Sequence, residues 1–291
     1  MIGELIPVIA PVFICAAIGF VWQRSGRAFP EETLGNLVMN VGTPCLIFST
    51  LATVGMDPAA LGAMSLAALA ATAVFGVAGA GLLWAGGLSL RGFTPTLMFP
   101  NSGNLGLPLA LFAFGEEGLA LGIAYFVINA IGQHTVGLSI ASGSVSLFRY
   151  VRSPIIYAVA LAALFMSTGL AVPRWIANTT DLIGGMTIPL LLITLGNSLA
   201  RLKVTGMGRS LGVSLVRLLM GFAVGVGIAE ALGWEGVARG VMILQSSMPV
   251  AVFSYLYAQT FRTEPEEVAG AVVISTILSF LTLPLLLWYV M

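Results

Sequence analysis

The stretch FPNSGNLGLP, residues 99–108, interrupts a chain that otherwise consists almost entirely of apolar runs. It holds two prolines, two glycines and two asparagines. Proline inside a helix removes a backbone donor and clashes with the preceding turn, and nearby glycines let the chain leave helical geometry at little steric cost. The stretch therefore predicts a broken helix.

The composition places this helix in a membrane. Hydrophobic residues make up 58% of the 291 residues, charged residues make up 8%, and the mean hydropathy is +1.02. These values lie far from those of a soluble domain. The apolar runs have the length of about 20 residues with which a helix crosses the hydrocarbon layer, and they lack the alternation of barrel strands. We therefore expect an all-α polytopic membrane protein embedded in a lipid bilayer.

The same composition excludes several kinds of partner. The formal net charge is zero, so there is no electrostatic case for nucleic acid. Cys15 and Cys45 lie within apolar runs and are expected to be small buried residues. The acidic residues fall in expected loops or near span ends, as Asp57 and Asp181 do. We therefore expect no cofactor and no metal site.

Ten membrane-spanning helices are expected, joined by short connections. Their ranges are 4–22, 32–53, 58–84, 93–114, 118–141, 153–171, 180–200, 207–231, 237–260 and 267–290. If the N-terminus lies outside, most basic residues fall in cytoplasmic connections: Arg24, Arg27, Arg91, Arg149, Arg152, Arg201, Lys203, Arg209 and Arg262. Only Arg174 and Arg239 then fall outside. Because cytoplasmic loops are enriched in Lys and Arg, we expect both termini to face outward.

The two halves of the chain resemble each other. Pro44 in MNVGTPCLIFSTLA aligns with Pro189 in GGMTIPLLLITLGNSLA, and Pro108 in NLGLPLALF aligns with Pro249 in QSSMPVAVF. Because each half has five expected spans, the second half crosses the membrane in the opposite sense. The pattern predicts an inverted repeat in which the fourth and ninth spans are both broken.

Paired breaks of this kind mark the usual binding site of a secondary transporter. We expect the half-helix after each break to begin at or near Pro108 or Pro249. Its N-terminal N–H groups would then stabilise a carboxylate near the bilayer midplane. The polar residues before the breaks are Asn101, Ser102, Asn104, Gln245, Ser246 and Ser247. They could merely repair helix kinks, but two clusters at repeat-related positions favour a binding site.

Arg217 is the permanent charge that lies deepest in an expected span. A central arginine costs at least about 2.5–3.5 kcal/mol on the most lenient insertion scale. It could neutralise a substrate carboxylate, donate to helix-end carbonyls or extend to the cytoplasmic surface. The sequence leaves these three roles open.

The sole histidine, His134, lies in the fifth span beside Gln133 and close to Asn129. It could act as a protonatable switch. The simpler interpretation is a hydrogen-bonded histidine that ties neighbouring helices together, because no acidic partner is in view. We treat these three residues as candidates for support or coupling.

Several segments together resemble one known family. PNSGNLGLP resembles the P-N-x-x-x-x-G-x-P crossing segment of the auxin efflux carrier family, which includes plant PIN proteins and many bacterial transporters. LQSSMPVAVF resembles the family's second crossing segment, typically L-P-Q-G-x-V-P. The similarity extends to TPCLIFSTL, to LLITLGNSLA and to the ten-span layout. It thus covers essentially the whole chain.

The resemblance implies an elevator-type carrier, related in fold to bile-acid symporters and sodium–proton antiporters. Residues 1–57 and 149–203 would form a scaffold that also makes a homodimer, and residues 58–148 and 204–291 would form the moving transport domain. Asn101 matches the crossover asparagine, and Gln245 matches the glutamine of the second crossing. Thr43 and Ile47 match scaffold positions that face the substrate. The third span lacks acidic residues beyond Asp57, which argues against auxin itself as the substrate.

These observations favour a secondary transporter in a bacterial inner membrane that exports small organic anions such as carboxylates. Because no carboxylate is expected near the crossing, we expect the substrate gradient and the membrane potential to drive transport. The alternative is a sodium- or proton-coupled symporter, since carbonyls and hydroxyls alone can bind sodium. An intramembrane enzyme is a remote alternative because the chain lacks a catalytic set. A receptor would not require paired helix breaks.

Overall fold

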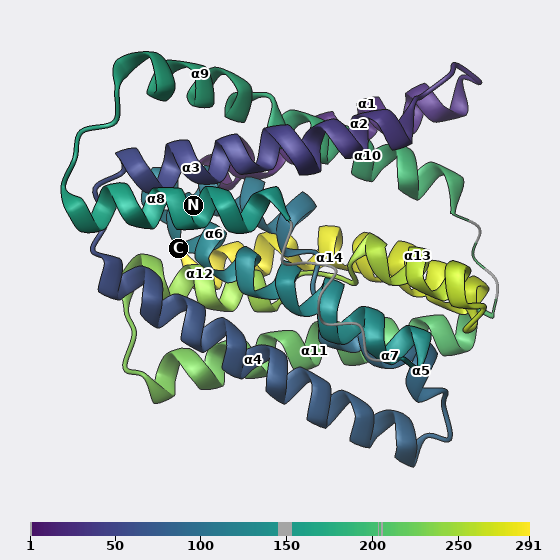
Figure 1. Ribbon diagram of the computed structural model, residues 1–291. Helices are drawn as coiled ribbons and strands as arrows, with labels where there is room; N and C mark the ends of the chain where they lie inside the picture. The colour runs from purple at the N-terminus through teal and green to yellow at the C-terminus, as the bar shows by residue number, and fades with distance from the viewer. Residues whose placement is uncertain (1, 145–152, 203, 205) are drawn as a thin grey trace.

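The computed structural model describes residues 2–144, 153–202, 204 and 206–291, and in this part of the chain the regular structure is helical (Figure 1). The first half contains α1 (Ile2–Arg24), α2 (Glu31–Leu37), η1 (Val38–Gly42), α3 (Thr43–Thr53), α4 (Pro58–Ala85), α5 (Leu90–Met98), η2 (Ser102–Gly106), α6 (Leu107–Gly132), η3 (Gln133–Gly137) and α7 (Leu138–Ser142). The second half contains α8 (Pro154–Thr168), α9 (Arg174–Gly185), α10 (Thr187–Arg201), α11 (Met207–Ala231), α12 (Gly236–Ser246), α13 (Val252–Phe261) and α14 (Pro265–Val290). The η segments are π-helices that continue directly into α-helices.

The molecule is a polytopic membrane protein. Within the described residues, seven helices are long and apolar enough to cross a membrane. Their outer faces carry large apolar side chains: Leu66 and Val77 on α4 are 70% and 78% exposed. Such faces are unfavourable in water and favourable in hydrocarbon. The expectation of an all-α integral membrane protein is confirmed.

Several expected spans match single helices closely, namely α1, α4, α11 and α14. The fourth and fifth expected spans instead share one helical run, Ser102–Ser142. Gly115 interrupts this run with a φ of 66° and a ψ of −156°, at the expected boundary between the two spans. The ten-span path therefore remains a prediction. Arg149, Arg152 and Lys203, which were used to orient it, lie outside the described residues.

The two broken helices cross at the centre of the molecule. Helical structure stops between Met98 and Ser102, and again between Ser246 and Val252. At the crossing, Pro100 and Val250 form an isolated antiparallel bridge. The backbone of Asn101 also donates to the carbonyl of Pro249 over 2.8 Å, and that of Ala251 donates to Phe99 over 3.3 Å. Residues from the two halves thus satisfy each other's freed backbone groups.

The restart points of the helices differ from those expected. Helical structure resumes at Ser102, well before Pro108, which becomes the second residue of α6. Pro249 lies inside the second break, and α13 begins three residues later at Val252. Pro100, rather than Pro108, therefore faces the Pro249 region across the crossing. After the first break, helical structure resumes early because the π-helix Ser102–Gly106 precedes α6 and runs directly into it.

Helices α1 and α10 pack together at very short range. A Cβ atom on Gly19 would lie 1.9 Å from the carbonyl oxygen of Ile193, and one on Gly196 would lie 1.8 Å from that of Ala16. Only glycine allows this approach of two helix backbones. α3 packs against α8 and α9, whereas α4 packs against α5 and α6, and α11 packs against α12 and α14. These pairs fall within the expected scaffold and transport domain, although that division remains a prediction.

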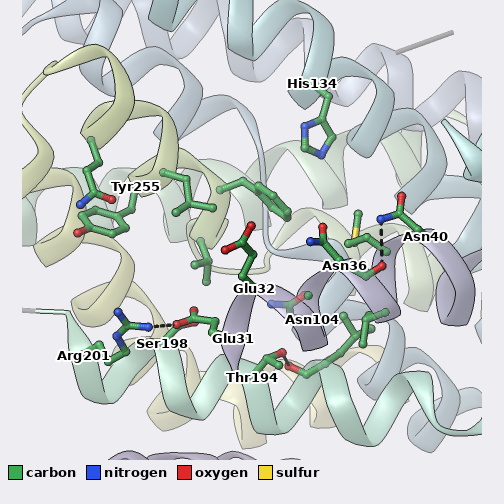
Figure 2. A pocket seen from close by; sticks show the side chains of 18 of the residues that line it. Glu31, Glu32, Asn36, Asn40, Asn104, His134, Thr194, Ser198, Arg201 and Tyr255 are labelled. Carbon is green, nitrogen blue, oxygen red and sulfur yellow. Dashed lines mark hydrogen bonds and ion pairs between the residues drawn. The ribbon is translucent and has the colours of Figure 1, made fainter. Parts of the chain in front are cut away.

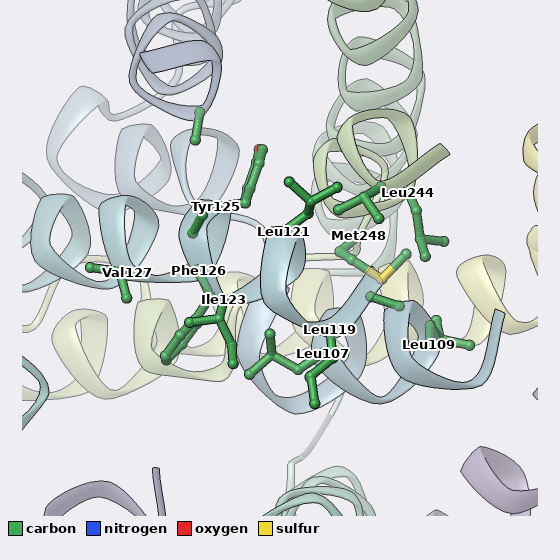
Figure 3. Packing of buried hydrophobic residues seen from close by; sticks show 14 of the residues in the cluster. Leu107, Leu109, Leu119, Leu121, Ile123, Tyr125, Phe126, Val127, Leu244 and Met248 are labelled. Atoms are coloured by element: carbon green, nitrogen blue, oxygen red, sulfur yellow. The ribbon is translucent and has the colours of Figure 1, made fainter. Parts of the chain in front are cut away.

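A buried apolar cluster includes residues of α6, of α12 and of the second break (Figure 3). It includes Leu107, Leu109 and Leu121 of α6 together with Leu244 of α12 and Met248 in the second break, and each of these is at most 2% exposed. The cluster holds α6 against α12. The broken backbone is therefore fixed by packing as well as by hydrogen bonds.

Candidate functional site

Two adjoining cavities lie beside the crossing. The outer cavity has a volume of about 730 Å³, within the usual range for small-molecule sites. The inner cavity has a volume of about 30 Å³, roughly that of one water molecule in the liquid. Both are lined by Met39, Asn104, His134, Leu191, Val252 and Phe253. The inner cavity is therefore a small recess, lined by both apolar and polar side chains, beside a space that could hold a whole metabolite.

The outer cavity lies between α2, α10 and α13 (Figure 2). Glu31, at the start of α2, accepts hydrogen bonds from Asn197 and Ser198 and pairs with Arg201, all on α10. Glu32 also lines the cavity and is exposed. Glu31 is thus bonded to the neighbouring helix, whereas the Glu32 carboxylate is exposed where it lines the cavity.

The inner cavity is lined by polar side chains whose hydrogen-bonding capacity is not used. Thr43 Oγ1, Asn101 Nδ2, Asn129 Oδ1 and Gln133 Nε2 are buried and have no hydrogen-bond partner. The Asn129 amide is oriented by its other end, because Nδ2 donates to Pro100 O over 3.0 Å and to Ser102 Oγ over 2.7 Å. A buried polar atom without a partner costs about 1–3 kcal/mol. Several such atoms around one recess indicate a place for a polar ligand group.

Two helix N-termini also reach the inner cavity. The π-helix η2 begins at Ser102, α13 begins at Val252, and both residues line the cavity. The first turn of a helix leaves N–H groups without intrahelical partners and carries partial positive charge. Both ends therefore favour an anion in the recess.

All three π-helical segments contribute to the cavity walls. Met39 belongs to η1, Asn104 to η2 and His134 to η3, and each lines both cavities. A π-helix widens the turn and changes the direction of the side chains that follow, and it is frequent at functional sites. No proline or glycine pattern predicted these segments in the sequence.

His134 links η3 to α13. Its Nδ1 lies 2.7 Å from the Tyr257 hydroxyl, and its ring packs edge to face against Phe253 at 4.9 Å. The arrangement matches the structural interpretation, in which the histidine ties neighbouring helices together. The residue also lines both cavities, so it remains a candidate for contact with a ligand.

Arg217 is completely buried and does not extend to the surface. Nη1 donates to Leu97 O over 2.7 Å, Nε donates to Met248 O over 3.3 Å, and Nη2 donates to Ser246 O. The guanidinium also lies 4.3 Å from the centre of the Phe75 ring. Of the roles left open by the sequence, the structure supports donation to helix-end carbonyls. A cation near a helix C-terminus interacts favourably with the partial negative charge of the last carbonyls.

The other predicted site residues lie around the cavities rather than in their walls. Ile47 is buried in the apolar core, and Pro108 and Pro249 are buried near the crossing. Ser246 Oγ lies 3.2 Å from the Tyr125 hydroxyl, and Ser247 Oγ donates to Ile243 O. Gln245 is fully buried, and neither atom of its amide has a partner. None of these residues lines either of the two cavities described here.

Comparison with known proteins identifies the family. A family model described as membrane transport protein matches residues 5–146 and 138–287, which is nearly the whole chain. The chain belongs to this membrane transport protein family. It is therefore a transporter rather than an enzyme.

Named relatives of this membrane transport protein come from archaea and plants. The chain is 29% identical to an uncharacterized transporter of Methanothermobacter thermautotrophicus over 289 residues, 94% of each chain. It is 27% identical to an uncharacterized transporter of Methanocaldococcus jannaschii over 211 residues, 68% of each chain. A probable auxin efflux carrier component of Oryza sativa subsp. japonica is 24% identical over 148 residues, 48% of this chain and 26% of the rice protein. The resemblance to the auxin efflux carrier family is thus confirmed.

Proposed function

We propose that this membrane transport protein is a secondary carrier of small organic anions, and that the substrate carboxylate binds in the inner cavity. The observation that carries the proposal is the set of unpartnered polar atoms there. Three are potential donors, on Thr43, Asn101 and Gln133. An ionised carboxylate only accepts hydrogen bonds, so it complements them. The N-termini of η2 and α13 supply positive partial charge at the same place.

The two cavity sizes limit the kind of substrate. The inner cavity, at about 30 Å³, admits part of a carboxylate and little more. The remainder of the molecule would lie in the outer cavity, between apolar side chains such as Met39, Leu191 and Phe253 and polar ones such as Asn40. Small monocarboxylates and dicarboxylates fit this division better than inorganic anions. An inorganic anion would make no contact with the apolar side chains of the outer cavity.

The proposed mechanism is an elevator movement. Residues 58–148 and 204–291 would move as the transport domain against a scaffold of residues 1–57 and 149–203, and the scaffold would also form a homodimer. The close glycine contacts between α1 and α10 support a rigid scaffold. Both cavities are lined by residues of both proposed parts: Thr43 and Asn101 line the inner cavity, and Glu31 and Tyr255 line the outer one. A sliding movement there would expose the substrate alternately to each side.

We further propose that the protein lies in a bacterial inner membrane with both termini outside and exports its substrate. Glu31 and Arg201 at the outer cavity are then near the cytoplasmic surface, so the cavity opens to the cytoplasm. When an anion leaves an inside-negative cell, its electrical free energy falls by about 2.3 kcal/mol per charge for each 100 mV of membrane potential. Export by this route needs no coupling ion.

The test is transport by the purified protein in liposomes. Vesicles loaded with labelled mono- or dicarboxylates should release them faster than protein-free vesicles, and a negative interior should accelerate release. A thermal-shift screen with the same acids, their amides and amino acids should select the carboxylates. Equal stabilisation by acids and amides would defeat the anion assignment. Release that requires a sodium or proton gradient would instead favour the coupled symporter.

A further inference from the structure

Three backbone carbonyl oxygens from both halves of the chain converge on the side chain of Arg217. Leu97 lies in the last turn of α5, Ser246 is the last residue of α12, and Met248 lies within the second break. The final carbonyls of a helix have no intrahelical partners and carry partial negative charge. The guanidinium therefore lies where the negative ends of both broken helices meet.

Carbonyl groups arranged in this way are cation ligands. In transporters with broken helices, unwound carbonyls and half-helix C-termini coordinate sodium ions, and rings of carbonyls alone replace the hydration shell of potassium ions in channels. None of the hydrogen-bond partners of Arg217 in the described part of the chain is a carboxylate. Neutral oxygen ligands suit a monovalent cation better than a divalent one, because calcium and magnesium sites rely on carboxylates.

The neighbouring helices accommodate the guanidinium closely. Gly221, one turn after Arg217, has no side chain, and a Cβ there would lie 2.3 Å from Ser246 O and 2.9 Å from Arg217 Nη2. Phe75 of α4 covers the other side with its ring face, a favourable contact for a cation. The carbonyl oxygens and the Phe75 ring thus surround the guanidinium, and Arg217 is 0% exposed.

We propose that the Arg217 guanidinium occupies a monovalent cation site at the crossing and takes the place of a bound coupling ion. Removal of the side chain would leave the three carbonyls without a cation, and sodium, potassium or free guanidinium would then bind there. The native carrier needs no such ion because its cation is covalently attached. This last consequence rests on the proposed transport function, whereas the site itself does not.

The direct test is cation-dependent stability of variants. Purified Arg217→Ala and Arg217→Gln proteins would be melted in sodium, potassium, choline and guanidinium chlorides at equal, non-denaturing concentrations. We expect both variants to melt below the wild type in choline and to recover by several degrees, in a saturable manner, in at least one of the other three salts. The wild type should show no difference among sodium, potassium and choline.

Ser214→Ala is the matched control. Ser214 lies one turn before Arg217 on α11, is fully buried and donates to Ser210 O and Ala271 O. Its loss removes buried hydrogen bonds but no charge, so the melting temperature should fall without any cation-specific recovery. An equal response of Arg217→Ala and Ser214→Ala to all salts would overturn the proposal. So would failure of both Arg217 variants to fold in every cation, because the carbonyls would then not accept a free ion.

A transport measurement separates this inference from the proposed function. Wild-type liposomes should release a carboxylate equally well in sodium, potassium and choline, and a strict sodium requirement in the wild type would contradict the proposal. If no anion is transported under any condition, the carrier assignment fails. The cation-dependent melting of Arg217→Ala would still report on the site.

Discussion

The backbone N–H of Asn101 donates a hydrogen bond to the carbonyl oxygen of Pro249, a residue of the other half of the chain, over 2.8 Å. This bond fixes the backbone of a residue that lines the inner cavity and whose buried side-chain nitrogen, Nδ2, has no hydrogen-bond partner. Asn101 therefore has two separate roles at the crossing, one for its backbone and one for its side chain. Its backbone joins the halves, and its Nδ2 atom is free to bind the ligand that we propose.

Asn101→Ala should weaken ligand binding while leaving the fold intact. The Nδ2 atom has no partner in the protein, so its removal costs no internal hydrogen bond. A lost hydrogen bond to a charged ligand is worth about 1.5–3 kcal/mol, or roughly a 10- to 150-fold increase in Kd. Isothermal titration or thermal shift with the transported acid would measure it.

Asn129→Ala is the contrasting variant. Its amide holds Pro100 O and Ser102 Oγ, so the loss should reduce stability by about 1–3 kcal/mol even without ligand. If Asn101→Ala lowers the unfolding temperature as much as Asn129→Ala does, the amide of Asn101 has a structural role and the site assignment is wrong.

Glu32→Gln should increase the apparent affinity for an anion. The carboxylate lines the mouth of the outer cavity and repels negative substrates there. We expect the KM for export to fall a few-fold at low ionic strength and the difference to shrink in salt, since the Debye length is about 10 Å at 0.1 M. Glu235→Gln, at the exposed start of α12, serves as the control. An unchanged KM at low salt would show that substrates do not pass this opening.

Asn40→Cys tests which side of the membrane the outer cavity faces. Asn40 is exposed and lines this cavity. With Cys15 and Cys45 replaced by serine, an impermeant maleimide should label Asn40→Cys in inside-out vesicles, and substrate should slow the reaction. Leu232→Cys, in the connection between α11 and α12, should react from the opposite side. Labelling of both variants from one side would refute the orientation proposed here.

Gly196→Ala should destabilise the pair of α1 and α10. The added methyl would lie 1.8 Å from the carbonyl oxygen of Ala16, so the helices must separate. Overpacking of this kind costs about 1–3 kcal/mol. Gly62→Ala is the control, because a Cβ there meets nothing within 4 Å and the helix should gain up to about 1 kcal/mol. Unfolding of both proteins in detergent provides the comparison, and equal stabilities would show that the contact is looser than described.

The sequence predicted the features that depend on composition and backbone chemistry. Hydropathy identified the all-helical membrane class, although the ten expected spans remain a prediction, and prolines with glycines located the two breaks to within a few residues. The restart at Ser102 was missed because the π-helical turn there depends on tertiary packing, which no local pattern reveals. Met39 and Leu191 were missed as cavity residues for a related reason, because apolar residues that line a cavity have the same composition as those in a core.

Side-chain partners were the least predictable part of the site. Arg217 was noticed for its charge, but its three carbonyl partners lie up to 120 positions away and meet it only after both helices break. Gln245 is the opposite case. Its place in the sequence matches a family binding position, yet its buried side chain lines neither cavity. Its role in binding remains a prediction. The sequence placed the candidate residues near the crossing. The direction in which each side chain points could be seen only in the folded structure.

The carbonyl oxygen of Asn101 accepts from the N–H of Leu105 at 3.4 Å and from that of Gly106 at 3.2 Å. This turn therefore holds an α-type and a π-type hydrogen bond at once, and both are long. We expect a ligand bound in the inner cavity to shift this turn toward one of the two hydrogen bonds. The rates of amide hydrogen exchange at Leu105 and Gly106 should accordingly change when substrate binds. This turn would then report on the occupancy of the inner cavity.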